Sequence, residues 1–271
     1  MRSVCFIVFF YAFFQQFAPA QSGFSTAGGA NFLGFGRAGV NIGGVAALYM
    51  NQAGLTEVNN FAFDLSAEKR FNLDELTSAS LAIAKKTGAG TFGLMFSRFG
   101  FDAYSENKLG LAYARKLMEN LSVGGQFDIL GLNIAGYGND TYFTFEAGLN
   151  YVINSEFSVA THIFSPGNIV VADGTNLGSR FRMGLKYSPS SKVFLLAEVD
   201  KVIDRQFTEY KFGISYKMVK ELELRFGANP SASLFTLGVA ANFSKKYTIA
   251  GAFGMNNVIG NTPSFSFSYD R

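Results

Sequence analysis

The chain has 271 residues and carries 23 Lys and Arg against 20 Asp and Glu, and this near balance gives no reason to expect a nucleic-acid partner. Only 16% of the residues are charged, while 31 Phe and 30 Gly accompany a positive mean hydropathy of +0.16, which is unusual for a soluble protein. A single cysteine excludes an internal disulfide and a cysteine-based metal cluster.

Residues 1–20 have the features of a cleaved signal peptide. An apolar run over residues 4–14 is followed by Ala18-Pro19-Ala20, which supplies the small residues that a signal peptidase reads. The run is shorter than the ~20 residues that a membrane-spanning helix needs. We therefore expect an exported protein with cleavage before Gln21, which would also remove the only cysteine, Cys5.

Residues 21–60 are rich in Gly and Ala and poor in charge, unlike a disordered tail. Gly34, Gly36 and Gly39 fit the G-x-G-x-x-G spacing of a dinucleotide-binding loop. That loop needs a buried strand before it and a helix after it, and the surrounding sequence does not indicate them, so we predict no cofactor. We expect a compact plug whose glycines permit close backbone packing.

Residues 61–271 alternate apolar and polar side chains with a period of two, which indicates strands. In residues 180–187, for example, Phe181 and Met183 alternate with Arg180 and Arg182. We predict fourteen such segments, each of ~9–12 residues, the length with which a tilted strand crosses a bilayer. They begin near Phe61, Thr77, Gly90, Glu106, Asn120, Thr141, Glu156, Ser179, Lys192, Gln206, Lys220, Ala232, Lys245 and Asn261.

These patterns predict an all-β fold, a 14-stranded antiparallel transmembrane β-barrel with an N-terminal luminal plug. The apolar stretches of the exported part are too short for helical spans, and only helices and closed barrels satisfy their backbone groups in lipid. The alternative is a secreted β-sandwich, which would leave little room for corners between so many long strands.

The connections between the predicted strands alternate in length. Short ones, such as residues 87–89 and 218–219, alternate with several longer ones, such as 100–105 and 165–178. Outer-membrane barrels have short periplasmic turns and longer outer loops. With an even number of strands, we expect both termini in the periplasm of a Gram-negative cell, with the barrel in the outer membrane and its lipid.

Many charged residues fall on the polar side of the predicted strands. A charge facing lipid at the bilayer midplane would cost ~2–4 kcal/mol, so we expect these side chains to point into the lumen. They are Glu68, Glu146, Arg180, Arg182, Lys186, Glu198, Asp200, Glu209, Lys211, Glu221, Glu223 and Arg225. We interpret them as a network that links the wall to the plug, and a charge-selective solute path is the alternative.

His162 is the only histidine, and the alternation places it on the same luminal face. The chain has no Gly-x-Ser-x-Gly motif and no pair of residues with metal-ligand spacing. We therefore predict no enzyme activity, no catalytic residue and no metal site.

The run Gly34-Phe35-Gly36-Arg37-Ala38, followed by Asn51-Gln52-Ala53-Gly54-Leu55, resembles the N-terminal signature of FadL-type outer-membrane barrels and their PorV/PorQ-like relatives. Residues 109–117 and 120–124 resemble a hairpin of the same family, although Gln52 stands where the signature has a proline. The resemblance implies fourteen strands and an N-terminal plug. It makes Gly34, Gly36, Arg37, Asn51 and Leu55 our candidate residues for the plug or a ligand path.

The resemblance leaves two functions open. The PorV/PorQ-like relatives imply a non-enzymatic accessory of type IX protein secretion, which would dock secretion-system or cargo proteins, and the hairpin at residues 108–116 makes this our first expectation. The alternative is a FadL-like channel that takes up apolar small molecules such as fatty acids. A structural barrel with no transport role is a third possibility.

Overall fold

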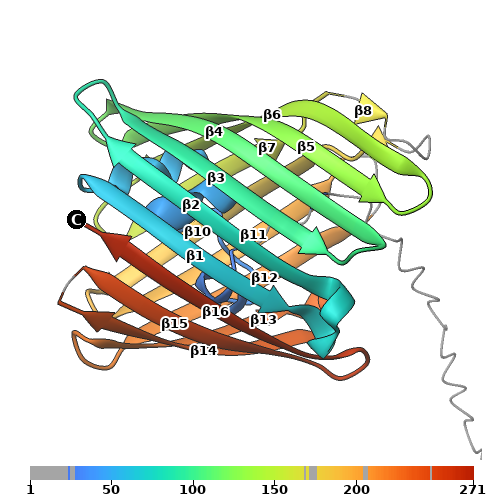
Figure 1. Ribbon diagram of the computed structural model, residues 1–271. Coiled ribbons are helices and arrows are strands. Elements are labelled where there is room, and N and C mark those ends of the chain that lie inside the picture. Colours follow the sequence, from blue (N-terminus) through green and yellow to red (C-terminus); the bar gives the residue numbers. More distant parts are fainter. Residues whose placement is uncertain (1–23, 25–27, 168, 171–175, 204–206, 245) are drawn as a thin grey trace, which may run out of the picture.

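The computed structural model describes Phe24 and residues 28–271, except residues 168, 171–175, 204–206 and 245. The predicted signal peptide, residues 1–20, lies outside the described residues. Fourteen antiparallel strands form one closed barrel, and the last strand pairs with the first (Figure 1). The predicted fold class is thereby confirmed.

The barrel strands are β1 (Phe61–Lys69), β2 (Thr77–Lys86), β3 (Thr91–Gly100), β4 (Tyr104–Met118), β5 (Leu121–Ile134), β6 (Gly138–Val152), β7 (Phe157–Phe164), β10 (Arg180–Ser190), β11 (Val193–Val202), β12 (Thr208–Lys217), β13 (Leu222–Asn229), β14 (Leu234–Phe243), β15 (Tyr247–Asn256) and β16 (Gly260–Asp270). Each begins within a few residues of its predicted start. Where the observed start differs from the predicted one, cross-strand pairing explains the difference. For example, β6 begins at Gly138 rather than near Thr141, because Gly138 still pairs with Ile134 of β5.

One element was not predicted. The segment expected to be a loop at residues 165–178 contains β8 (Ile169–Val170) and β9 (Asn176–Leu177), which form a separate two-stranded sheet outside the barrel. Two-residue strands are too short to produce a periodic signal, so alternation in the sequence does not reveal them.

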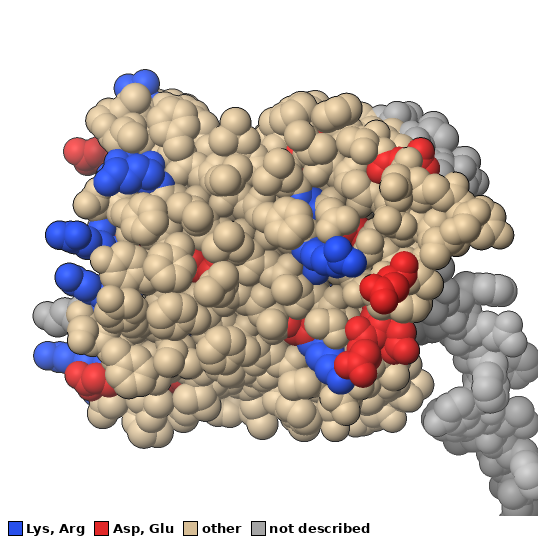
Figure 2. Space-filling model, viewed as in Figure 1, with Lys and Arg blue, Asp and Glu red and all other residues tan. Residues whose placement is uncertain are grey.

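Alternate side chains of each strand point into the barrel and out of it, as the period of two in the sequence predicts. In β12, for instance, Phe212 and Ile214 are exposed on the outer surface, whereas Lys211 and Ser215 are buried. The registers of neighbouring strands keep like faces together, so Ile214 of β12 pairs with Phe226 of β13. The result is an apolar belt around the barrel, the surface that faces lipid in a membrane barrel. On the face shown in Figure 2, charged side chains gather toward the two ends of the barrel.

The barrel has two dissimilar ends. The turn end carries the tight connections β2–β3, β4–β5, β6–β7, β10–β11, β12–β13 and β14–β15, together with the C-terminal end of β16. The loop end carries the other connections, which include η3 (Arg70–Asn72), η4 (Asp74–Leu76), η5 (Pro230–Ala232) and the β8–β9 hairpin. Figure 1 shows the C-terminus at the turn end. Among the described residues, no helix is long and apolar enough to cross a membrane.

The segment of residues 28–60, directly before β1, lies inside the barrel (Figure 1). It contains three short helices, α1 (Ala30–Leu33), η1 (Val45–Tyr49) and η2 (Gln52–Glu57), and the Asn51 side chain caps η2 by accepting from the Ala53 amide at 3.2 Å. We call residues 28–60 the plug.

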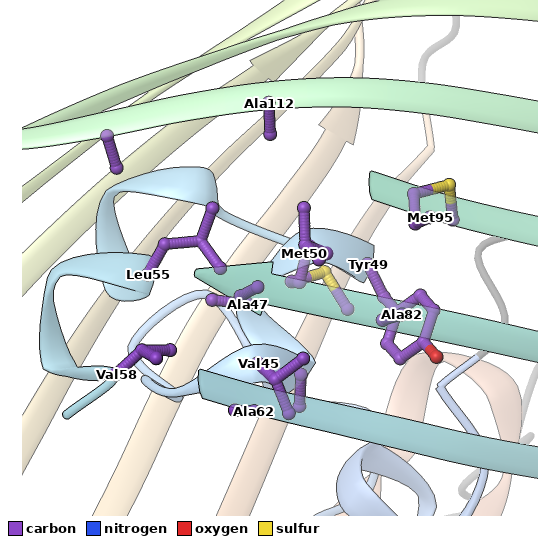
Figure 3. Close-up of a cluster of buried hydrophobic side chains, with 14 of the residues drawn as sticks. Val45, Ala47, Tyr49, Met50, Leu55, Val58, Ala62, Ala82, Met95 and Ala112 are labelled. Atoms are coloured by element: carbon purple, nitrogen blue, oxygen red, sulfur yellow. The ribbon is translucent and has the colours of Figure 1, made fainter. Parts of the chain in front are cut away.

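The largest apolar cluster of the interior joins the plug to the wall. In Figure 3, Val45, Tyr49 and Leu55 of the plug lie beside Ala62 and Ala82 of the wall. Because alanine side chains are short, the wall leaves room for the larger side chains of the plug, which are buried to 6% exposure or less.

Candidate functional site: the plug and its contacts

The plug follows the inner wall of the barrel and meets many strands at a glycine. A Cβ atom on any of these glycines would lie within 3.1 Å of a plug atom, closer than nine in ten real Cβ contacts. They are Gly93, Gly124, Gly148, Gly184, Gly213, Gly227, Gly238 and Gly254. The wall is therefore shaped for this plug, and the plug fits against β3, β5, β6, β10 and β12–β15.

The backbones of plug and wall approach closely at Gly36. Its φ of +63° is one that side chains disfavour, and a Cβ atom there would lie 2.6 Å from the Ala228 amide nitrogen of β13. The Gly36 amide donates to the Thr236 hydroxyl of β14 at 3.0 Å. Glycine is thus required at this position both for its conformation and for its size.

Asp64 of β1 is a buried carboxylate that is satisfied by hydrogen bonds. It accepts from Asn31 Nδ2 at 2.8 Å and from the Tyr49 hydroxyl at 3.1 Å, both in the plug. Ser66 and Ser268 of the wall also donate to it, at 2.5 and 2.6 Å. Burial, and then the Asp64 charge, raise the pKa of Tyr49 well above its usual value, so the phenol remains a donor.

Two further wall carboxylates hold the middle of the plug. Glu68 of β1 accepts from Arg37 at 2.6 Å, and Arg70 donates to the same oxygen at 2.9 Å. On the opposite side, Glu198 of β11 accepts from the backbone amides of Gly39 and Val40 at 2.7 and 2.8 Å. These contacts satisfy backbone and side-chain donors that have left water, which would otherwise be costly.

Glu146 of β6 is the centre of a row of buried charges. One carboxylate oxygen pairs with Lys108 of β4, whose ammonium group also lies 3.5 Å from Asp128 of β5. The other accepts from Gln52 Nε2 of the plug at 2.7 Å and lies 2.8 Å from His162 Nε2. The carboxylate therefore ties the plug to β4 and β7, on either side of β6.

His162 of β7 continues the row. Arg182 Nη1 of β10 lies 3.2 Å from His162 Nδ1. Because a guanidinium can only donate, Nδ1 must be the acceptor, which leaves the imidazole proton on Nε2 to donate to Glu146. His162 is thus a neutral linker between an anion and a cation, and its sequence-predicted place on the luminal wall agrees with the structure.

From Arg182 the row passes to Asp200 of β11 and then to Lys211 of β12. Arg182 Nε lies 3.2 Å from Asp200, and Lys211 Nζ lies 2.6 Å from the same oxygen and 3.2 Å from Glu198. From β10 to β12 the signs alternate on adjacent strands, which keeps each of these buried charges beside an opposite one. The row crosses the wall from β4 to β12 and ends at Glu198, which holds the plug.

The five plug residues singled out from the sequence are distributed along the plug rather than gathered at one point. Gly34 and Gly36 lie against β13 and β14, and Arg37 pairs with Glu68. The Asn51 amide donates to the carbonyls of Val40 and Leu149, at 2.8 and 3.3 Å. Leu55 is fully buried in the apolar cluster of Figure 3.

Four of the remaining predicted luminal charges, Arg180, Glu209, Glu223 and Arg225, also face inward. Arg180 lies 3.4 Å from Asp200, and Asn229 donates to Glu209 at 3.1 Å. Arg225 pairs with Glu223 at 2.9 Å and stacks over the Phe35 ring of the plug, 4.9 Å from its centroid.

The last two predicted luminal charges, Lys186 and Glu221, differ in whether their side chains lie inside the barrel. The Lys186 ammonium lies 4.8 Å from the centroid of the Phe194 ring, inside the barrel. Glu221 corrects the prediction, because it is exposed: β13 begins only at Leu222, so Glu221 belongs to the preceding turn rather than to the alternating strand.

Sequence reasoning missed several residues that hold the plug. Asp64 and Lys108 alternate with apolar neighbours, so the same period-two signal could have identified them as luminal. Gln52 occupies the position of the signature proline and donates to Glu146, a role that no local pattern reveals. The wall glycines carry no signal of their own, because their use depends on contacts distant in sequence.

A smaller apolar cluster lies at the loop end. Phe24 packs against Leu130 of β5 and Leu177 of β9, together with Tyr142, Phe164 and Ile169. Beside it is a hollow of about 150 Å³, part of it open to solvent, which is lined by Phe24, Ser97, Phe99, Glu106 and Lys108. It leaves almost no room even for a water-sized molecule, so it is not an ordinary ligand pocket.

Within the described ranges of the chain, no group of three His, Cys, Asp or Glu side chains is placed to hold a metal ion. The buried charges instead bind one another and the plug. The buried charges of the lumen therefore serve to hold the plug in place.

No protein-family model and no curated protein sequence matches the chain. Solved structures of similar shape include the P. putida toluene transporter TodX (TM-score 0.68, 14% identity, covering 90% of this chain and 98% of that one) and the CymD monoaromatic hydrocarbon channel (0.66, 14%, 90% and 97%). A Pseudomonas aeruginosa FadL homologue is also similar (0.62, 11%, 89% and 98%). At these identities the likeness shows a shared fold, the FadL-type barrel.

Proposed function

We propose that this protein is a channel of the Gram-negative outer membrane that passes apolar small molecules, with both termini in the periplasm. The observation that carries the proposal is the lumen filled by the chain's own N-terminal segment, which reaches an apolar cluster at the loop end through Phe24. The shared fold with hydrocarbon channels supports it. The short turns at the end that bears the C-terminus support the orientation.

The loop-end cluster is the proposed entrance. Its side chains are apolar and aromatic, which suits a hydrocarbon or an acyl chain. The neighbouring hollow is too small for such a solute while Phe24 is in place. A solute would therefore compete with Phe24 for this cluster and then move between plug and wall. Its path would avoid the buried charge row, because an apolar molecule in the row would separate paired charges at high cost.

The sequence-based preference for a secretion accessory is not retained. The three similar structures named above are described as a toluene transporter, a hydrocarbon channel and a FadL homologue, which favours the channel that the sequence placed second.

Uptake of a radiolabelled fatty acid and of radiolabelled toluene tests the proposal, in cells whose outer membrane lacks other FadL-type channels. We expect the protein to restore uptake of at least one of them. Phe24→Ala should lower the concentration for half-maximal uptake about tenfold, since a buried Phe side chain contributes ~1.5–3 kcal/mol. Phe101→Ala is the matched control, because Phe101 is exposed at the same end and outside the cluster.

Uptake of neither solute, together with stoichiometric co-purification of secretion-system or cargo proteins in native mass spectrometry, would overturn the proposal in favour of the secretion accessory. An isolated barrel that retains an apolar ligand in the same measurement would support the channel.

A further inference from the structure

The turn end of the barrel is basic. Its exposed basic residues are Lys85, Lys86, Arg115, Lys116, Lys192, Lys217, Lys220, Lys246 and Arg271. The acidic residues described there are fewer: Glu57, Glu119, Glu156, Glu221 and Asp270. In Figure 2, Lys and Arg side chains line the edge of the barrel at this end.

The loop end has the opposite balance. The exposed acidic residues described there are Asp74, Glu75, Asp102 and Asp140, against the exposed basic residues Arg98 and Lys201, and Lys69 is paired with Asp74 at 2.6 Å. In Figure 2, acidic side chains gather at this end of the same face. The charge is thus distributed asymmetrically along the barrel axis, although the whole chain is nearly neutral.

Three tight turns at the basic end also expose apolar pairs. They are Leu117 with Met118, Val152 with Ile153, and Met218 with Val219, and these side chains are between 42% and 64% exposed. The pairs belong to separate turns, β4–β5, β6–β7 and β12–β13, so they are spread around the circumference. A single protein partner prefers one contiguous patch, whereas a surrounding lipid layer contacts a ring.

We propose that this turn-end rim, the basic residues and apolar pairs together, binds the anionic headgroups of bilayer phospholipids. The apolar pairs lie where strands with exposed apolar side chains end in turns, which would place them at the boundary between acyl chains and headgroups. Lys and Arg side chains extend their polar ends past that boundary and attract anionic lipid phosphates. The loop end, with its acidic excess, lacks this preference.

The chain contains no tryptophan, so a single introduced one reports on its own surroundings. Phe235 and Phe243 lie toward opposite ends of β14, at the loop end and the turn end, and are 56% and 52% exposed. Phe235→Trp and Phe243→Trp therefore give matched reporters in otherwise identical proteins. Each variant is reconstituted in vesicles of equimolar phosphatidylcholine and phosphatidylglycerol, with bromine on one lipid at a time.

With Phe243→Trp, brominated phosphatidylglycerol should quench about twofold more than brominated phosphatidylcholine, because basic residues enrich anionic lipid locally. With Phe235→Trp, the two lipids should quench equally. High salt should remove the difference, since it screens exposed charges.

The charge dependence is tested by removing Lys217, Lys220 and Lys246 together as Gln in the Phe243→Trp protein, which should abolish the preference. The matched control removes Arg98 and Lys201 at the loop end in the same way and should leave it intact. Equal quenching by both lipids at Phe243→Trp overturns the proposal, as does a preference that survives loss of the three lysines. Crosslinking of the rim to an acidic protein, with no lipid preference, would assign the rim to a protein partner instead.

Discussion

The plug is held in different ways by two parts of the wall. The charged wall, β4–β7 and β10–β12, binds it through carboxylates such as Glu146 and Glu198, which accept from Gln52 and from the amides of Gly39 and Val40. The small-residue wall, β14–β16, presents mainly Ala, Gly, Ser and Thr side chains, against which α1 packs. At the charged wall, directional hydrogen bonds fix the position of the plug. At the small-residue wall, close packing fixes the distance between plug and wall.

The difference shows that plug and wall form one folded unit. Buried carboxylates are costly unless donors satisfy them, and on the charged wall several of these donors come from the plug. On the small-residue wall, removal of the plug would leave an apolar groove lined by Ala240, Ala250 and Ala252. Both walls therefore depend on the plug, for different physical reasons.

Removal of the plug should give the largest effect, because it breaks the contacts with both walls at once. Deleting residues 21–60 should raise single-channel conductance in planar bilayers by at least about tenfold, since a barrel of this size encloses more than its own wall side chains can fill. Heat resistance of the folded barrel on gels should fall as well. Unchanged conductance with a correctly folded barrel would mean that the lumen is closed by the wall alone.

Loss of the central carboxylate tests the charged wall. Glu146→Ala should lower the free energy of unfolding by about 3–5 kcal/mol, because it leaves Lys108 without one of its two carboxylate partners and Gln52 without its acceptor. Urea unfolding in lipid vesicles, followed by circular dichroism, measures the change. Glu119→Ala, in an exposed turn, is the control and should have almost no effect.

Overpacking tests the small-residue wall. Ala250 is 1% exposed and lies in the cluster with Ala30 and Leu33 of α1, so Ala250→Leu should cost about 1–3 kcal/mol. The neighbouring lipid-facing substitution Ile249→Leu should be nearly neutral. Equal stability of the two variants in the same urea titration would show that the plug does not fit tightly at this wall.

A single hydrogen bond should give the smallest effect. Tyr49→Phe removes one donor from Asp64, which keeps Asn31, Ser66 and Ser268 as donors. We expect a loss of about 1 kcal/mol, the usual contribution of one hydrogen bond. A loss as large as that of Glu146→Ala would show that Asp64 depends on the phenol far more than its other donors indicate.

The fold could be read from the sequence because lipid and lumen impose opposite polarity on alternate residues. That constraint acts on every strand. The luminal face of a strand, such as the one with Arg180 and Arg182, can therefore be recognised without knowing which strands pair with it. The same alternation placed Glu146 and Lys211 in the lumen. The predicted luminal position of Glu221 was wrong, because the alternation in the sequence begins before the residue at which β13 begins.

The contacts of the plug could be anticipated only in part. The glycines at Gly34 and Gly36 indicated close packing, but the sequence does not say that Gly36 meets Ala228 or that Gln52 meets Glu146. Such pairs are separated by many residues, and no periodic or local rule relates them. The two-residue strands β8 and β9 were missed for the related reason that they are too short to have a period.

The pairing of β16 with β1 has a consequence for the order of folding. Contacts across this seam join opposite ends of the chain, and Ser266 of β16 also donates to the Gly28 carbonyl of the plug at 3.4 Å. Closing a loop of nearly the whole chain is entropically slow. We therefore expect seam closure and seating of the first plug residues to form a single late kinetic step, after the hairpins between neighbouring strands have assembled.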